Sequence, residues 1–250
     1  MTQLTRVVVP IDPDDAASWS YAIAYAQAIG SGAQPPARSY VLLTHAKEQL
    51  KRSSLARHMG EPAAKALLAN NLVGIGNGDQ LGHATMQTLR VSRGTVVIAF
   101  YADEKMVDRL DGVAGVIGIV GIPDLPNSID GWIARWNPRI HGRQQGAPKA
   151  LITDPVVEKA LTSLSSWINL SHAVMNPRDK GYADETLRIL RAKGHTFEPV
   201  QMRSWAIRHG WQPGSADELG RLAARIGDLK IKPSLKAYHD PDGRYDRWTR

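Results

Sequence analysis

The pattern of apolar residues changes near residue 145, and no other feature constrains the fold of this chain as strongly. Before that point, short apolar runs alternate with stretches of helical periodicity. The runs are VVVPID (7–12), YVLLTH (40–45), TVVIAF (95–100) and GVIGIVGI (115–122). After it, helical patterns continue up to a basic and aromatic tail. Strands that alternate with helices predict a parallel sheet, and a run of helices after them predicts a separate module.

We therefore predict a Rossmann-like α/β domain over residues 1–145, followed by a helical domain over residues 146–250. The segment NPRIHGRQQGAPKA (137–150) holds two Pro and two Gly and has no apolar period, which is typical of a linker. The two clearest strands, TVVIAFYADE and GVIGIVGIP, are apolar at successive positions, so both faces of the predicted sheet are expected to be covered.

The composition excludes several classes of function. The chain has no cysteine, so disulfides, thiol catalysis and cysteine metal sites are excluded. No apolar stretch approaches the roughly 18–20 residues that span a membrane. The segment MTQLTRVVVP does not have the pattern of a signal peptide, so we expect a cytoplasmic protein without a membrane partner.

The net charge of +7 is concentrated in two zones. Residues 38–93 carry eight basic side chains against three acidic ones, and residues 201–250 carry ten against six. Basic surfaces favour polyanions such as DNA or RNA, whereas Lys and Arg also serve simply to solvate helices. Both interpretations stay open.

Asp12 follows the first predicted strand and is the first candidate ligand-binding residue. Ligands of open parallel sheets bind outside the carboxyl ends of the strands, where an Asp can accept a ribose hydroxyl or a base edge. Alternatively, Asp12, Asp14 and Asp15 only cap the helix that follows.

The V-P-x-D sequence within residues 7–15 resembles the first strand of universal stress proteins. The resemblance covers little more than these residues, and the glycine-rich nucleotide signature of that family has no match later in the chain. It implies a Rossmann-like fold and a nucleotide such as ATP at Asp12.

A second candidate ligand site is the glycine-rich turn of Gly74, Gly76, Gly78 and Asp79, placed between a predicted strand at 72–75 and a predicted helix at 80–91. Backbone N–H groups of such a turn, together with a helix N-terminus, favour a nucleotide phosphate or another small anion. Asp79 would repel a phosphate unless it held a sugar or a metal. A plain turn is the alternative, because neither the P-loop nor the Rossmann spacing is present.

Common catalytic motifs are absent from the sequence. There is no G-x-S-x-G, no H-E-x-x-H and no paired-carboxylate pattern, and the eight histidines have no ligand spacing. We therefore assign no catalytic residue, no metal and no cofactor. Asp12, His45, Asp79 and Asp103 are all expected near strand ends, where they can assemble in space.

The C-terminal part predicts three helices followed by a hairpin, which is the layout of a winged-helix module. One helix begins at Pro199, and the next begins with the capping box of Ser215 and Glu218. The hairpin is predicted at 235–248, with its turn at Asp240-Pro-Asp-Gly243. The fold class is thus α/β, with a winged-helix-like C-terminal domain.

The sequence MRSWAIRHGW (202–211) resembles the W-A-x-x-x-G helices of small bacterial chromatin proteins and helix-turn-helix modules, which implies DNA binding. A helix in a groove and a basic wing on the backbone would use seven side chains. These are Arg203, Arg208, Arg221, Arg225, Lys236, Arg244 and Arg247. Asp217 stands four residues before Arg221, so an ion pair within the helix is the alternative role of Arg221.

Three functions follow from these patterns. The first is a bacterial-type regulatory protein that binds DNA or RNA and senses a ligand or a partner through its Rossmann-like domain. The second is a nucleotide-processing hydrolase or transferase with acidic residues at the strand ends. The third is a protein–protein interaction scaffold. Oligomerisation is compatible with each.

Overall fold

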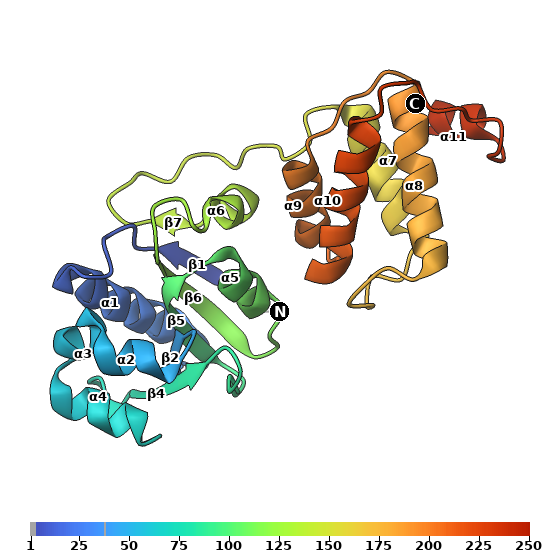
Figure 1. Cartoon of the computed structure of the whole chain (residues 1–250). Coiled ribbons are helices and arrows are strands. Elements are labelled where there is room, and N and C mark those ends of the chain that lie inside the picture. The colour runs from blue at the N-terminus through green and yellow to red at the C-terminus, as the bar shows by residue number, and fades with distance from the viewer. Residues whose placement is uncertain (1–3, 38) are drawn as a thin grey trace. The chain divides into compact units, whose positions relative to one another are not determined.

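A computed structural model describes residues 4–37 and 39–250 of the chain (Figure 1). The chain divides into two compact units, Met1–Ala147 and Pro148–Arg250. This division falls close to the change of sequence pattern near residue 145. None of the helices formed by the described residues is long and apolar enough to cross a membrane.

The first unit, called here the α/β unit, contains a sheet of seven strands in the order β3-β4-β2-β5-β6-β1-β7. The strands are β1 (Thr5–Val8), β2 (Ser39–Thr44), β3 (Val73–Gly74), β4 (Gln80–Thr85), β5 (Thr95–Ala102), β6 (Val116–Pro123) and β7 (Arg139–Ile140). All neighbours pair in parallel except β3 and β4. The predicted α/β class with a parallel sheet is confirmed.

The order of the parallel strands differs from the usual Rossmann arrangement. In that arrangement the first strand lies in the middle of the sheet, beside the second and the fourth. Here β1 lies between β6 and β7, and the centre of the sheet is formed by β2, β5 and β6. The layers are thus Rossmann-like, whereas the strand order is not.

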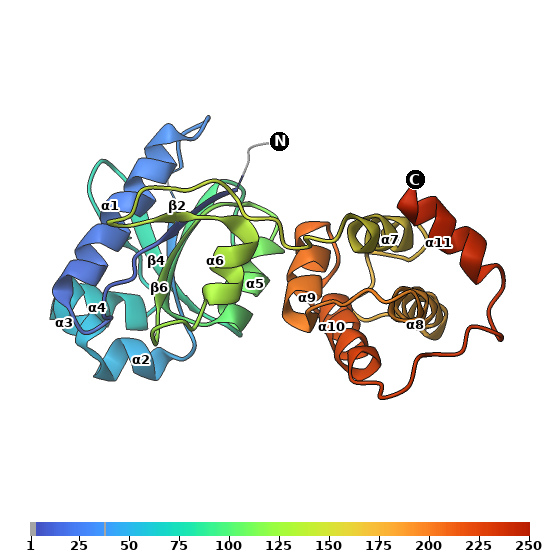
Figure 2. The same cartoon turned by 90° about the horizontal axis from the view of Figure 1, so that it is seen from above.

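Helices cover both faces of the sheet (Figure 2). One face packs on α1 (Ala16–Gly32), α2 (Lys47–Arg52), α3 (Ser54–Met59) and α4 (Glu61–Leu68), and the other packs on α5 (Glu104–Asp111) and α6 (Asp130–Trp136). In β2, Leu42 belongs to the first core cluster and Leu43 to the second. Because both side-chain directions are buried, the strand sequences are continuously apolar.

The helices that follow neighbouring strands lie on opposite faces at two places in the sheet. β1 and β2 lead into helices of the first face, whereas β5 and β6 lead into helices of the second. Because β1 pairs with β6 and β2 pairs with β5, both pairs form switch points where ligands of open sheets bind. His45 and Asp103 directly follow the paired strands β2 and β5.

The helix predicted at 80–91 was wrong, because residues 80–85 form strand β4. β4 pairs in parallel with all six residues of β2. The glycine-rich turn connects β3 to β4, and these two strands pair antiparallel. Gly76, Asn77 and Gly78 have positive φ angles, which reverse the chain tightly. Gly82 also weakens any helix here, so the ladder to β2 decides the structure of this segment.

The second unit, called here the helical unit, consists of five helices. They are α7 (Pro155–Ser165), α8 (Pro177–Ala192), α9 (Pro199–Arg208), α10 (Pro213–Gly227) and α11 (Pro241–Thr249). Each begins with proline, which lacks the N–H that a first turn leaves without a partner. The helices predicted to begin at Pro199 and near Ser215 are confirmed as α9 and α10. The buried side chains of the unit include Leu161, Leu187, Trp205 and Leu219.

The hairpin predicted at 235–248 was wrong, because residues 241–249 form helix α11. The carboxylate of Asp240 accepts a hydrogen bond from Gly243 N at 3.1 Å, and Pro241 occupies the first turn. Asp followed by Pro begins a helix as readily as it forms a turn, and burial of Trp248 favours the helix. Residues 148–250 contain no strand, so the winged-helix character is not confirmed.

Candidate functional site

The glycine-rich turn lies at the amino ends of the parallel strands, whereas the other predicted site residues lie at the carboxyl ends. Asp79 precedes β4, whereas Asp12, His45 and Asp103 follow the carboxyl ends of their strands. Within the turn, Asp79 N donates to Gly76 O at 2.8 Å, and the Asp79 side chain is buried. Because a strand follows instead of a helix, the helix N-terminus that favoured an anion is missing. Ligand binding by Gly74, Gly76, Gly78 and Asp79 stays a prediction.

His45 and Asp103 are brought together at the carboxyl edge of the sheet. Nε2 of His45 lies 3.1 Å from Tyr101 O and 3.8 Å from Oδ2 of Asp103. Because a carbonyl oxygen only accepts, Nε2 carries a proton when it makes the first contact. Asp103 also caps α5 through Met106 N at 2.8 Å. This pair can hold a polar ligand at the switch point between β2 and β5.

The acidic segment after β1 mainly organises the start of α1. Oδ1 of Asp12 accepts from Asp14 N at 2.9 Å, and Asp15 caps the helix through Ala17 N at 2.8 Å. Asp14 accepts a hydrogen bond from the hydroxyl of Ser54 at 2.5 Å. The described residues contain no group of three or more His, Asp or Glu side chains placed to hold a metal ion.

His83 lies on β4, is half-buried and contacts Thr44 of the neighbouring strand. The Thr44 hydroxyl donates to Ala46 O at 3.0 Å, so it accepts from Nε2 of His83 at 2.9 Å. Burial, with a smaller contribution from the charge of Lys47, lowers the pKa of His83 from 6.5 to about 4. His83 is therefore a neutral structural residue rather than an acid–base group at neutral pH.

This low pKa predicts a loss of stability in mild acid. Between pH 6.5 and about 4, the unfolded chain protonates this residue and the folded chain does not, so the free energy of unfolding falls as the pH falls. His83→Gln should flatten that fall, measured by urea unfolding across this pH range. The exposed His239 is the matched control, since His239→Gln should leave the slope unchanged. If the free energy of unfolding of His83→Gln falls with pH as steeply as that of the original chain, His83 is not the cause of the loss.

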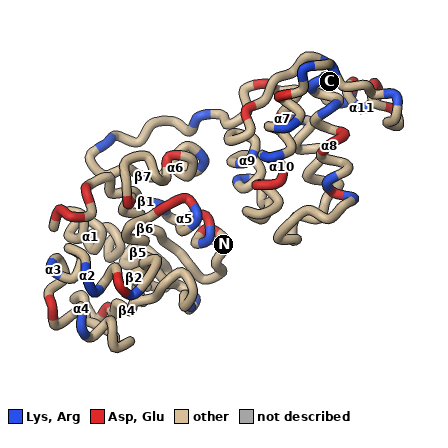
Figure 3. Tube along the Cα trace, viewed as in Figure 1, with Lys and Arg blue, Asp and Glu red and all other residues tan. Residues whose placement is uncertain are grey.

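Four of the seven arginines and lysines predicted to bind nucleic acid are held in ion pairs. Arg203 contacts Asp217 at 2.5 Å, so Asp217 pairs across to α9 rather than with Arg221 on its own helix. The others are Arg225 with Asp184 at 2.7 Å, Arg244 with Glu185 at 2.8 Å and Arg247 with Asp240 at 3.4 Å. Arg208, Arg221 and Lys236 are exposed. Basic and acidic residues alternate over the helical unit, as Figure 3 shows.

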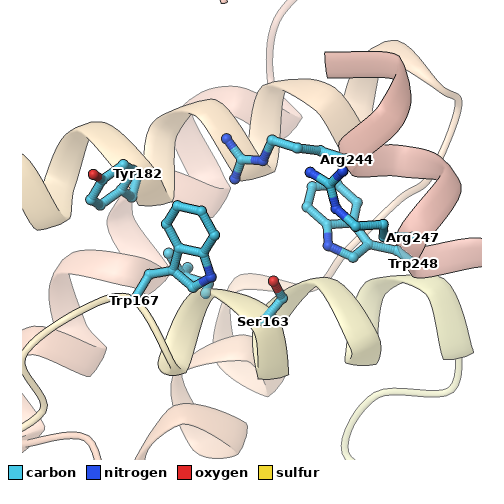
Figure 4. A pocket seen from close by; sticks show the side chains of 7 residues that line it. Ser163, Trp167, Tyr182, Arg244, Arg247 and Trp248 are labelled. Carbon is cyan, nitrogen blue, oxygen red and sulfur yellow. The ribbon is translucent and has the colours of Figure 1, made fainter. Parts of the chain in front are cut away.

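A shallow groove in the helical unit gathers aromatic and arginine side chains from α8, α11 and the segment that follows α7 (Figure 4). We call it the aromatic–arginine groove. Its lining residues are Ser163, Leu164, Trp167, Tyr182, Arg244, Arg247 and Trp248. The enclosed part measures only about 20 Å³, room for a single water molecule. A ligand would therefore lie across the groove rather than inside it.

One end of the groove presents aromatic rings to solvent. Trp167 follows α7, is 62% exposed and meets Tyr182 of α8 edge to face, with 5.8 Å between the ring centroids. The guanidinium of Arg178 lies 5.4 Å from the centroid of Tyr182 and donates to its hydroxyl at 3.2 Å. Tyr182 is thus fixed in place, whereas the indole of Trp167 is available for stacking.

The other end of the groove carries two arginines of α11. Arg244 is held by Glu185 at 2.8 Å and by the hydroxyl of Thr186 at 3.0 Å, and its guanidinium lies 5.6 Å from the centroid of Trp248. Arg247 is 60% exposed and its single ion pair is long. In Figure 4 the guanidinium of Arg244 points toward Trp167.

Trp167, Tyr182 and Ser163 line the groove but were not among the site residues predicted from the sequence. The sequence signal for Trp167 is its position after the apolar residues of α7, and its side chain does not join the buried residues of that helix. Arg244 and Arg247 were predicted to bind nucleic acid, but on a hairpin rather than on a helix beside these aromatic residues.

The helical unit matches a family model described as a domain of unknown function (DUF1889), over residues 153–249. The match spans all five helices and every residue of the aromatic–arginine groove. Neither the curated proteins nor the solved structures include a significant match to the chain. The fold and the groove thus define a two-unit α/β and helical protein whose second unit is similar to this family.

Proposed function

We propose that the chain is a nucleic-acid-associated protein whose helical unit binds single-stranded DNA or RNA across the aromatic–arginine groove. The observation that carries the proposal is the exposed indole of Trp167 beside Tyr182, with Arg244 pointing toward it and Arg247 at the other end of the same groove. Aromatic platforms next to cationic side chains are the means by which proteins hold unpaired bases and their phosphates.

The charge of the helical unit supports a polyanionic ligand. Residues 148–250 carry 17 Lys and Arg against 12 Asp and Glu, so this unit contributes most of the net charge. A shallow groove also suits a chain that continues on both sides, whereas a small molecule binds best in a deeper cavity that buries most of its surface.

Two features favour a single strand over a duplex. The helix α11 stands where a wing was expected, so the second element of a duplex-binding winged helix is missing from the described part of the helical unit. An exposed aromatic ring stacks on a base only when that base is unstacked from its neighbour, as in single strands. The mode of binding therefore differs from the duplex surface suggested by the sequence.

Fluorescence anisotropy with labelled single strands of about 20 nucleotides tests the proposal, since such strands exceed the usual binding-site size. We expect the full chain to bind the single strand more tightly than a duplex of the same sequence. Neutralising about two to four phosphates should give a slope of log K against log salt of about −1.5 to −3. Equal binding of the duplex, or affinity that does not change with salt, would reject this mode of binding.

A further inference from the structure

Three side chains of the helical unit, none of which lines the groove, are joined in series by hydrogen bonds. Asp154 precedes α7, His195 follows α8, and Tyr245 lies on α11. Oδ2 of Asp154 lies 2.6 Å from Nδ1 of His195, and Nε2 of His195 lies 2.9 Å from the Tyr245 hydroxyl oxygen. The imidazole thus bridges a carboxylate and a phenol.

The positions of the protons follow from the carboxylate. Although burial raises the pKa of Asp154, hydrogen bonds from His195, Val156 and Val157 hold it below its ordinary value. Asp154 is therefore ionised at neutral pH and accepts only, which places the proton of a neutral imidazole on Nδ1. Nε2 is then the acceptor, and the Tyr245 hydroxyl donates to it.

This arrangement has the order of a nucleophile, a base and a group that orients the base. Tyrosine is among the side chains that form covalent intermediates. Tyr245 also lies between Arg244 and Arg247 in the sequence of α11, the helix that supplies arginines to the groove. Nζ of Lys193 lies 5.1 Å from the centroid of the Tyr245 ring and provides another cation beside the phenol.

We propose that Tyr245 is the nucleophile of a strand-cleaving reaction on phosphodiesters, with His195 as its general base and Asp154 as a positioning residue. The inference rests on the proposed binding of nucleic acid by the same unit. It assigns to this unit a chemical step in addition to binding.

In the step, the Tyr245 oxygen attacks the phosphorus atom while its proton passes to Nε2 of His195. A tyrosine–phosphorus ester bond forms, and the bond from phosphorus to one nucleoside oxygen breaks. His195 returns the proton to that leaving oxygen, which becomes a free hydroxyl end. One phosphoester bond replaces another, so no oxidant, reductant or further reactant is consumed.

Tyr238 provides a matched control within the same unit. Its hydroxyl donates to Oδ2 of Asp184 at 3.4 Å, and no imidazole contacts it in the described part of the chain. Burial and the charge of Asp184 raise its pKa, so this phenol is a poor nucleophile. Tyr238→Phe removes a tyrosine hydroxyl of the helical unit without touching His195.

The experiment uses the full chain with a single strand that carries a different fluorophore at each end. We expect a covalent protein–strand adduct that persists on a denaturing gel and maps to Tyr245 by mass spectrometry. Tyr245→Phe should form none, and His195→Gln should form it at least about 100-fold more slowly, as for loss of a general base. Tyr238→Phe should react like the original chain. An adduct that persists in Tyr245→Phe would overturn the inference.

Asp154→Asn tests the positioning role without removing the helix cap, because asparagine caps as well as aspartate. An amide N–H turned toward Nδ1 favours the other tautomer, so adduct formation should become slow near neutral pH. It should recover only at alkaline pH, where hydroxide can replace the imidazole as the base. A residue with a purely structural role would lower the rate without changing this pH profile.

A second substrate separates failure of the reaction from failure of binding. Thymidine 5′-(p-nitrophenyl phosphate) has a good leaving group and does not depend on binding of a strand. A labelled strand that binds without forming an adduct, together with no nucleotidyl-tyrosine from this ester, overturns the reaction and leaves the proposed binding intact. Nucleotidyl transfer to Tyr245 without strand binding supports the nucleophile and rejects the proposed function.

Discussion

Replacing Trp167 by alanine is expected to weaken binding of a single strand by about 5- to 150-fold, because stacking of one base on an aromatic ring is worth about 1–3 kcal/mol. The side chain is 62% exposed, so its removal should cost little of the free energy of unfolding. Anisotropy titration measures the affinity, and thermal unfolding checks that the fold is retained.

Two variants serve as controls for that result. Trp167→Phe keeps an aromatic face and should retain most of the affinity, whereas Val200→Ala removes an exposed apolar side chain of α9 outside the groove and should change nothing. If Trp167→Ala binds as tightly as the original chain, the groove is not the binding site.

Replacing Arg135 by alanine should destabilise the α/β unit by about 3–5 kcal/mol, the cost of breaking a buried ion pair. Arg135 lies on α6 with its side chain fully buried, and it pairs with the buried Asp108 of α5 and with Glu104 at 3.6 Å. Without the guanidinium, the Asp108 carboxylate stays buried next to a cavity. Urea unfolding followed by circular dichroism measures the loss.

A double substitution distinguishes the charge from the packing. Arg135→Met together with Asp108→Leu replaces the pair by apolar groups and should recover most of the lost stability, because the double variant buries neither charge of the pair. A double variant as unstable as Arg135→Ala would show instead that the packing between α5 and α6 is what Arg135 supports.

The elements that sequence reasoning located share strong local signals. The continuous apolar runs of β5 and β6 predict buried strands because both faces are covered, and the Asn176–Pro177 start of α8 satisfies the first turn of a helix by itself. Such signals act within a few residues, so they are visible without the rest of the chain.

The two wrong elements had local signals that fit two structures. The sequence of residues 80–85 predicts a helix, but pairing with β2 makes this segment a strand. The Asp240-Pro241 pair predicts a turn, but burial of Trp248 favours a helix. In both cases a contact with a residue distant in sequence decides between local alternatives of similar free energy.

The candidate sites show the same dependence on distant contacts. Arg244 and Arg247 were predicted from the sequence as part of a basic wing that contacts a nucleic-acid backbone. Their partners in the groove, Trp167 and Tyr182, lie more than 60 positions earlier in the sequence. The ion pair of Arg203 with Asp217 likewise joins two helices.

By itself, the sequence determined that a parallel α/β sheet precedes a helical unit, because apolar periodicity and caps act over short ranges. Only the tertiary structure decided the strand order, the placement of His45 beside Asp103, the groove around Trp167 and the chain from Asp154 through His195 to Tyr245. The physical reason is that each of these joins side chains from separate elements. Their distances are set by packing of the core, which no local pattern records.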